Sequence, residues 1–258
     1  MIIFSEVNTM KNIHYKKIKT NKIRSFILLL LLGLYPVSLF SQGYEGSPCK
    51  KDNRSLIETI KSGQIRGIHI GGGDPGQHTH MSSSFLKAEG KPPAIPKADE
   101  YGDGSESWAY DSWTCMYDAT KAWDGKTNTA WSEGVKGPGI GEILLVYINI
   151  SKKAEIWTGF GKSESLFKKN NRPKKVRLHL FKSTEGGPTQ NGYSYGNLKK
   201  VSTSEVTLKD VNKYQPLNLP KYTADKKEEN ANYILAIEIL EVYKGSKYDD
   251  TLITEIKQ

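Results

Sequence analysis

One short segment carries the residue types that bind a hard metal ion. Residues 121–129, KAWDGKTNT, offer the Asp124 carboxylate, the Thr129 hydroxyl and a glycine-containing turn that can aim backbone carbonyls inward. Calcium is bound by about six to eight oxygens of these kinds. The segment therefore predicts a calcium site. The alternative is a plain Asp-Gly turn in which Thr129 bonds its own backbone.

A second candidate site lies in residues 88–113, which are rich in proline, glycine and aromatic side chains and predict a long loop. Loops of this length are usually functional. Aromatic rings can stack on the flat C–H faces of sugars, while Asp103, Glu106 and Asp111 can accept hydrogen bonds from sugar hydroxyls. The alternative role of the rings is to hold the loop against the domain. The candidate glycan-binding residues are Tyr101, Trp108, Tyr110 and Trp113.

Other noticeable residues favour structural roles. Trp123 and Trp131 flank the Asp-Gly turn, and a place in the core is favoured over stacking on a sugar. His78 and His80 could share a metal on a strand, but no third ligand accompanies them, so a surface pair is preferred. The basic run 168–175 could touch anionic membranes or acidic glycans, although a solvated turn is more typical.

The sequence favours a binding protein over an enzyme. The five histidines are scattered, and no His-Glu-x-x-His pattern occurs. The glycine-rich segment 71–76 lacks the Gly-Lys-Ser/Thr ending of a phosphate-binding loop. We therefore expect a noncatalytic protein.

The elements that must position these residues are mostly strands. Short alternating runs, separated by Gly, Asn, Pro and Lys clusters, are typical of an all-β sandwich or barrel. Residues 55–62 predict one short helix. Strands are predicted at residues 64–70, 143–150, 154–158, 175–181, 202–208, 215–219 and 233–241.

The N-terminus predicts export. Residues 11–25 are basic without a carboxylate, and they precede an apolar run at 26–40 that is shorter than the roughly 20 residues of a spanning helix. This order is typical of a signal peptide, here 1–41 with cleavage after Ser41. The alternatives are an uncleaved membrane anchor and, for the start, Met10 instead of Met1.

Export changes the charge and the chemistry of the cysteines. Without residues 1–41 the chain has 31 basic and 27 acidic side chains, a formal charge of +4, against +9 for the whole chain. That balance does not suggest binding to nucleic acid. In an oxidising compartment the two cysteines, Cys49 and Cys115, predict one disulfide, with two free buried thiols as the alternative.

Four segments in order carry a resemblance to a known family. The segments are 121–134, 137–142, 156–162 with 170–174, and 241–256. They resemble discoidin-like, galactose-binding-like jelly rolls, and more closely the glycan-binding domain found at the front of bacterial NAD-glycohydrolase toxins. Residues 82–86, SSSFL, resemble the family's first strand, so the resemblance spans about 78–258.

The resemblance implies a jelly-roll β-sandwich and a structural calcium ion that joins the beginning of the domain to its end. Its ligands would be the carbonyls of Lys121, Lys126 and Thr254 and the side chains of Asp124, Thr129 and Glu255.

The expected organisation is a signal peptide at 1–41, an N-terminal tether at 42–77 and a discoidin-like sandwich at 78–258. The predicted function is noncatalytic carbohydrate binding, outside the cell or at its surface, with glycans as partners. One alternative is an adhesin-type relative that binds protein or phospholipid and so contacts a membrane surface. Another is an envelope protein held by an uncleaved anchor.

Overall fold

A computed structural model describes residues 48–49, 53–71, 81–94, 105–190, 192–224 and 231–258, all within the compact unit Gln42–Gln258. The predicted signal peptide, Tyr101, His78 and His80 lie outside the described residues. Among the described helices, none is long and apolar enough to cross a membrane.

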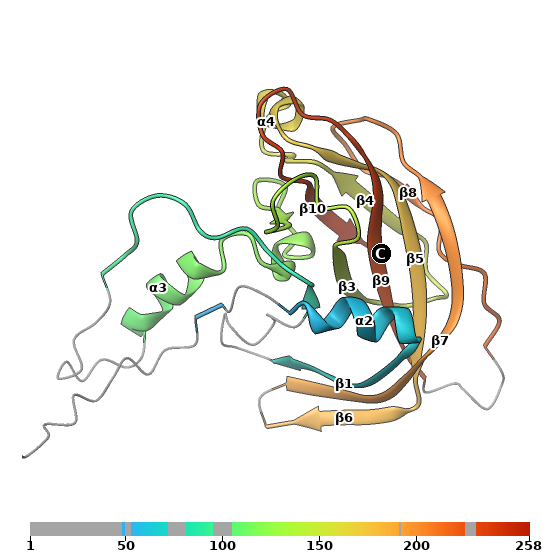
Figure 1. Ribbon diagram of the computed structural model, residues 1–258. Coiled ribbons are helices and arrows are strands. Elements are labelled where there is room, and N and C mark those ends of the chain that lie inside the picture. The colour runs from blue at the N-terminus through green and yellow to red at the C-terminus, as the bar shows by residue number, and fades with distance from the viewer. Residues whose placement is uncertain (1–47, 50–52, 72–80, 95–104, 191, 225–230) are drawn as a thin grey trace, which may run out of the picture. The chain divides into compact units, whose positions relative to one another are not determined.

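The fold consists of two antiparallel sheets, which confirms the predicted all-β sandwich (Figure 1). The larger sheet has the order β1 (Gln64–Gly71), β7 (Gly192–Thr207), β5 (Arg172–Ser183), β9 (Asn232–Tyr243) and β3 (Ile143–Ile148), and β6 (Glu185–Thr189) also pairs with β7. The smaller sheet has the order β2 (Trp131–Ser132), β10 (Leu252–Lys257), β4 (Ala154–Thr158) and β8 (Gln215–Leu217).

The core lies between the sheets. β3 and β9 are near-continuous apolar runs because both of their faces are largely buried. β4 instead alternates buried and half-buried residues. Trp131 is fully buried and donates its indole N–H to the Ser84 carbonyl at 3.0 Å, while the partly buried Trp123 packs against the same core. Both tryptophans therefore have the core placement that the sequence favours.

Two of the predicted elements at the N-terminal side of the sandwich are confirmed. α2 (Ser55–Ser62) buries Leu56 and Ile60, and it ends at Gly63, whose φ of 77° is easy only for glycine. β1 follows directly and pairs with β7. Residues 55–71, within the expected tether, thus contribute to the core and to the larger sheet.

Two short helices depart from the predicted pattern. The predicted loop 88–113 contains α3 (Ser105–Thr114), so the loop prediction is wrong for that part. Its aromatic and small polar residues give no amphipathic pattern from which a helix could be read. α4 (Glu164–Lys169) was also missed, although Ser163 caps it by accepting the Leu166 N–H at 3.2 Å. A third element, η2, is a single turn at Ala119–Ala122.

Several strand boundaries differ from the sequence prediction. β5 and β7 begin earlier than residues 175 and 202, because polar residues at their N-terminal ends pair in the ladder. Residues 82–86 form no extended strand; Ser82 makes one isolated bridge to Leu144. The strands β2, β6 and β10 had not been assigned from periodicity.

Cys49 and Cys115 form the predicted disulfide. The backbone N–H of Cys49 also donates to the Thr114 hydroxyl at 2.9 Å. The described N-terminal residues are therefore fixed to the end of α3.

Candidate functional site

A small groove of about 110 Å³ opens where several of the segments that carry the family resemblance come together. It is lined by the segment before α3, the loop after β4, α4 and the loop between β9 and β10. We call it the ligand groove, and the lining residues that matter here are Glu89, Tyr117, Phe160, Leu166, Tyr248 and Asp250.

Two buried side chains hold the loop between β9 and β10 against the groove. Asn171 donates its amide to the Asp249 carbonyl at 2.6 Å and accepts the Gly245 N–H at 2.7 Å. Arg172 donates to the Lys244 carbonyl at 3.2 Å and pairs with Asp210 at 2.6 Å. This explains why an Asn-Arg-Pro sequence accompanies the closing motif, since these residues shape the loop that carries Tyr248 and Asp250.

The groove gathers hydrogen-bonding groups around an aromatic hydroxyl. Burial, the Glu89 and Asp250 carboxylates, and a side-chain hydrogen bond to Glu89 raise the pKa of Tyr117. Burial, followed by Glu89 and Asp249, also raises the pKa of Asp250. Two carboxyl groups and a phenol thus face the same small space, beside the rings of Phe160 and Tyr248, whose side chain is 39% exposed.

Of the predicted aromatic residues, neither Tyr110 nor Trp113 lines this groove, but Trp113 contacts one of its lining residues. Trp113 donates its indole N–H to the Glu89 carbonyl at 3.2 Å, and its ring centroid lies 5.9 Å from that of Tyr110. The Trp108 side chain and all of Tyr101 lie outside the described residues. The structure therefore links Trp113 directly, and Tyr110 only through Trp113, to the backbone of the groove residue Glu89.

Three of the side chains predicted to bind calcium, those of Asp124, Thr129 and Glu255, come together. The Thr129 hydroxyl contacts both Asp124 carboxylate oxygens at 2.9 and 3.0 Å, and the Lys126 N–H donates to Asp124 at 3.0 Å. Burial first, and then Asp124, raises the pKa of Glu255 to about 7, although backbone N–H groups of Gly125 and Lys126 oppose this shift. Glu255 therefore lies against the Asp124 turn.

One further observation favours a bound cation at these residues. The Glu255 Oε2 atom is buried without a hydrogen-bond partner in the described part of the chain. The ladder between β10 and β4 shifts register between Ile253 and Glu255, which leaves Thr254 without a paired residue on β4. The other predicted ligands are the carbonyls of Lys121, which lies in η2, of Lys126 and of Thr254.

The basic run 168–175 is not a continuous solvated turn. Asn170 and Arg172 within it are buried. Lys168, Lys174 and Lys175 pair with Glu164, Glu241 and Glu205 at 3.2, 2.8 and 2.6 Å. This local pairing leaves little free positive charge for an anionic surface.

One cluster of potential metal ligands occurs among the described His, Cys, Asp and Glu residues. It consists of Cys49, Cys115 and Asp118, and because the cysteines form the disulfide they offer no thiolate.

A serine motif of hydrolases was overlooked in the sequence. Residues 192–196 read GYSYG, a Gly-x-Ser-x-Gly pattern, and the Ser194 hydroxyl lies 3.1 Å from His69 Nδ1. In hydrolases this serine sits on a sharp turn between a strand and a helix. Here Ser194 lies within β7, paired with β1 and β6. The pattern therefore has a structural context different from that of a nucleophile.

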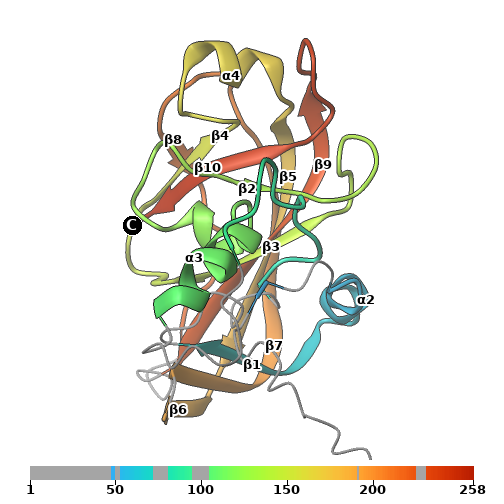
Figure 2. The same cartoon turned by 90° about the vertical axis from the view of Figure 1, so that its left-hand side faces the viewer.

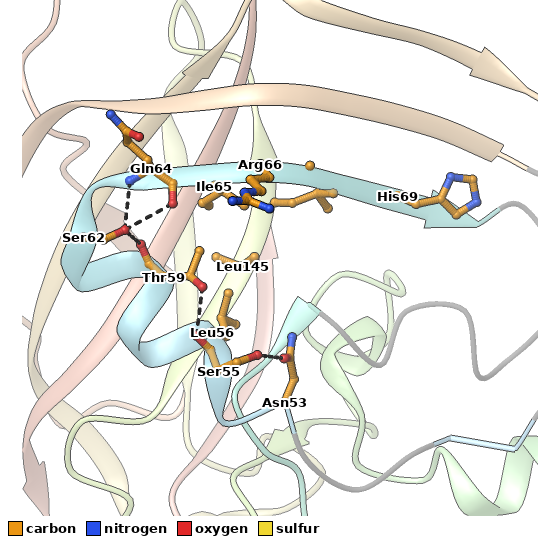
Figure 3. Close-up of a pocket in the computed structure, with 12 residues that line it drawn as sticks. Asn53, Ser55, Leu56, Thr59, Ser62, Gln64, Ile65, Arg66, His69 and Leu145 are labelled. Carbon is orange, nitrogen blue, oxygen red and sulfur yellow. Dashed lines mark hydrogen bonds between the residues drawn. The ribbon is translucent and has the colours of Figure 1, made fainter.

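A larger groove of about 570 Å³ runs between α2 and β1 (Figure 3). Leu56, Ile65 and Leu145 line it together with hydroxyl groups of α2 such as Thr59, whose hydroxyl donates to the Ser55 carbonyl at 2.9 Å. His69 lies at its far end in Figure 3. The family-like motifs do not line this groove.

The sequence prediction missed the residues that line the ligand groove. Phe160, Tyr248 and Asp250 stand inside the motifs used for recognition, so a signal was present. Glu89 and Tyr117 are separated from them by long stretches of chain. Only the folded loops bring Glu89 and Tyr117 to the same place.

Comparisons with known proteins agree with the fold. Residues 103–258 match the family described as the NAD glycohydrolase translocation F5/8 type C domain. No curated protein matches the chain.

Two solved structures show a faint likeness. The arabinofuranosyltransferase AftD from Mycobacteria is 14% identical with a TM-score of 0.31, over 70% of this chain and 14% of that chain. A GH29 fucosidase of Ruminococcus gnavus in complex with fucose is 10% identical with a TM-score of 0.23, over 55% of this chain and 22% of that chain. The chain thus spans a small part of either protein, and TM-scores this low do not establish a shared fold.

Proposed function

Because the chain belongs to the family of NAD glycohydrolase translocation F5/8 type C domains, we propose that it is an exported, noncatalytic module that binds carbohydrate in the ligand groove. Domains of this family are binding modules. The disulfide supports export, because such bonds persist in oxidising compartments.

The observation that carries the proposal is the composition of the ligand groove. Concave sites with a few convergent polar groups among aromatic walls are the usual form of small-ligand sites. Here Glu89 and Asp250 can accept hydrogen bonds from hydroxyls, and Tyr248 offers a partly exposed ring. Trp113, beside Glu89, extends the aromatic surface. A sugar, which combines hydroxyls with an apolar face, matches this mixture.

A glycan array with the full-length exported protein tests the proposal. We expect binding to a restricted set of glycans, with Asp250→Asn and Trp113→Ala each lowering affinity at least about tenfold, equivalent to about 1.4 kcal/mol. Glu58→Gln removes an exposed carboxylate on α2 and serves as the control. Absence of binding to every carbohydrate, or equal binding by all variants, would refute the proposed site.

We further propose that calcium stabilises the frame of the domain. Asp124, Thr129 and Glu255 supply three oxygen-bearing side chains from the beginning and end of the sandwich, and the carbonyls of Lys121, Lys126 and Thr254 would complete the shell. The buried, unpartnered Glu255 oxygen supports this assignment. A bound cation would supply positive charge that offsets the repulsion between the two carboxylates.

Thermal unfolding with and without calcium tests the metal site. A ligand at about 100 times its dissociation constant stabilises the folded state by about 2.7 kcal/mol, so the melting temperature should rise in wild type. Asp124→Asn should lose that rise, whereas Glu58→Gln should keep it. Identical melting of wild type in calcium and in chelator would reject the site.

A further inference from the structure

Three tyrosines that do not line the ligand groove form a second aromatic surface. Tyr147 lies on β3, and Tyr193 and Tyr195 lie two residues apart on β7, so the latter pair shares one face of the strand. The ring centroids of Tyr147 and Tyr195 are 5.9 Å apart with planes at 29°, and those of Tyr193 and Tyr195 are 4.8 Å apart at 34°. We call these three residues the tyrosine platform.

The platform has a buried centre and exposed flanks. Tyr195 is 7% exposed, whereas Tyr147 and Tyr193 expose 51% and 36%. Single exposed apolar residues are common, but three rings from β3 and β7 in contact with one another form a cluster rather than a scatter. Burial, followed by the two flanking tyrosines, raises the pKa of Tyr195 to about 12, so its phenol stays neutral.

A broad groove of about 820 Å³ includes the two exposed rings. Polar side chains surround them, among them Asn149, Thr184, Glu185 and Asn232. The described lining residues include one carboxylate and neither lysine nor arginine. The described part of the groove thus combines an aromatic wall with polar side chains and a single carboxylate.

The shape of the hairpin that carries Tyr193 depends on a glycine. Gly186 on β6 has a φ of 141°, and a side chain there would approach the Ser194 carbonyl to 2.2 Å. This close approach lets β6 pair with β7 at Gly186 and Tyr195. The platform is therefore built on paired strands rather than on a mobile loop, which lowers the entropy lost when a ligand binds.

The chemistry of this groove selects among ligand classes. Stacked nucleic-acid bases require a cationic path for the phosphates, and the described lining residues offer no lysine or arginine for one. A cage for a cation surrounds it with the faces of several rings, whereas Tyr195 is only tilted by 29° and 34° against its two neighbours. Neutral saccharides pair an apolar face with hydroxyls, and both features have partners here. Figures 1 and 2 show β6 at the end of the sandwich opposite α4, which borders the ligand groove.

We propose that the tyrosine platform, with Glu185 and Asn149, is a second carbohydrate-binding site that takes a neutral glycan chain and makes the domain bivalent. The ligand class of this second site rests on the proposed function. Its residues are separate from those of the ligand groove. Two sites at opposite ends can engage one polymer or two chains, and linked engagement raises apparent affinity by about 10²–10⁴ without new contacts at either site.

Affinity electrophoresis in gels containing mannan, dextran, galactomannan or xyloglucan tests the proposal with the full exported protein. We compare wild type with a platform variant, Tyr147→Ala/Tyr193→Ala, a groove variant, Trp113→Ala/Asp250→Asn, and their combination. Tyr147→Phe/Tyr193→Phe keeps the rings, and Ile140→Ala, at a residue 52% exposed, is the surface control. Melting temperatures confirm that each protein is folded.

We expect retardation in at least one gel to fall about tenfold or more in the platform variant, to persist in the Phe variant and the control, and to vanish in the combination. Platform variants that migrate like wild type, while the groove variant loses retardation, overturn the second site and leave the proposed function standing. Loss in the platform variant alone keeps the second site and refutes the ligand groove. Wild type that is not retarded in any gel overturns the second site, and the glycan array then decides the proposed function separately.

Discussion

Glu133 is a carboxylic acid that the fold buries completely. Its two oxygens accept the Val135 N–H at 2.9 Å and the Thr251 N–H at 3.1 Å, so it joins the segment after β2 to the start of β10. Gly139 makes room for it, since a side chain there would come within 2.4 Å of Glu133. Burial dominates the backbone hydrogen bonds and raises its pKa to about 7.

This raised pKa predicts a pH-dependent stability. Between the ordinary pKa of 4.5 and about 7, folded Glu133 binds more protons than unfolded Glu133, so the free energy of unfolding falls as pH rises through that window. The loss is on the order of 2–3 kcal/mol. Asp118 and Glu255, with pKa values raised by burial to about 6 and about 7, act in the same direction. His179, whose pKa burial lowers, opposes them.

Urea unfolding of wild type and Glu133→Gln at pH 5 to 8, in chelator, checks this prediction. The glutamine keeps the shape and cannot ionise, so the decline in stability with pH should become shallower, although the other carboxyl groups leave part of it. Glu58→Gln, at an exposed carboxylate, should keep the wild-type slope. Equal slopes in all three proteins would contradict the role given to Glu133.

At the same scale, the sequence pointed to Asp124 and Thr129 as members of one site but not to the ligand groove. Asp124 and Thr129 are five residues apart in one turn, so a local pattern can indicate that they lie close together. Glu89, Tyr117 and Asp250 line one groove although they come from distant parts of the chain. Burial and pairing of this kind depend on tertiary contacts that no local pattern encodes.

Among the elements, those with strong periodicity were predictable. β4, at Ala154–Thr158, was predicted at its observed bounds because its burial alternates. β6 was missed because Glu185–Thr189 contains two glycines and a proline and forms through its pairing with β7. α3 was missed because its aromatic residues resemble a binding loop more than an amphipathic helix.

α2 provides a test of how far the domain extends. It precedes the family-matched residues 103–258, yet Ile60 is 1% exposed and belongs to the core, and Lys200 donates to its carbonyl at 3.2 Å. Ile60→Ala should therefore lower the free energy of unfolding of the whole sandwich by about 2–5 kcal/mol.

Chemical denaturation of Ile60→Ala and of Lys61→Ala, an exposed change on the same helix, shows whether α2 unfolds together with the sandwich or separately from it. The lysine variant should differ from wild type by less than about 0.5 kcal/mol. If α2 were a detachable segment, Ile60→Ala would leave the main unfolding transition unchanged.

Across the whole molecule, the disulfide closes a chain segment that contains α2, β1, Glu89 and α3. Cys49 and Cys115 are 66 residues apart, and closing a loop of this length stabilises the folded state by about 4 kcal/mol through the entropy of the unfolded chain. The same link fixes the end of α3, which carries Trp113 beside the ligand groove. Stability and ligand binding should therefore share a dependence on this bond.

Replacement of both cysteines by serine should lower the melting temperature by about 10 °C, since about 1 kcal/mol corresponds to about 2–4 °C in a domain of this size. Dithiothreitol should shift wild type to the same midpoint and leave the double variant unmoved, which separates the bond from side-chain packing at Cys115.

On the glycan array, the double variant should bind more weakly than wild type at a temperature where both are folded, because the unlinked segment no longer holds Trp113 and Glu89 against the groove. A reduced protein with unchanged melting would show that the packing of α2 and α3 suffices. Unchanged melting with weaker binding would assign the disulfide to the site rather than to the fold.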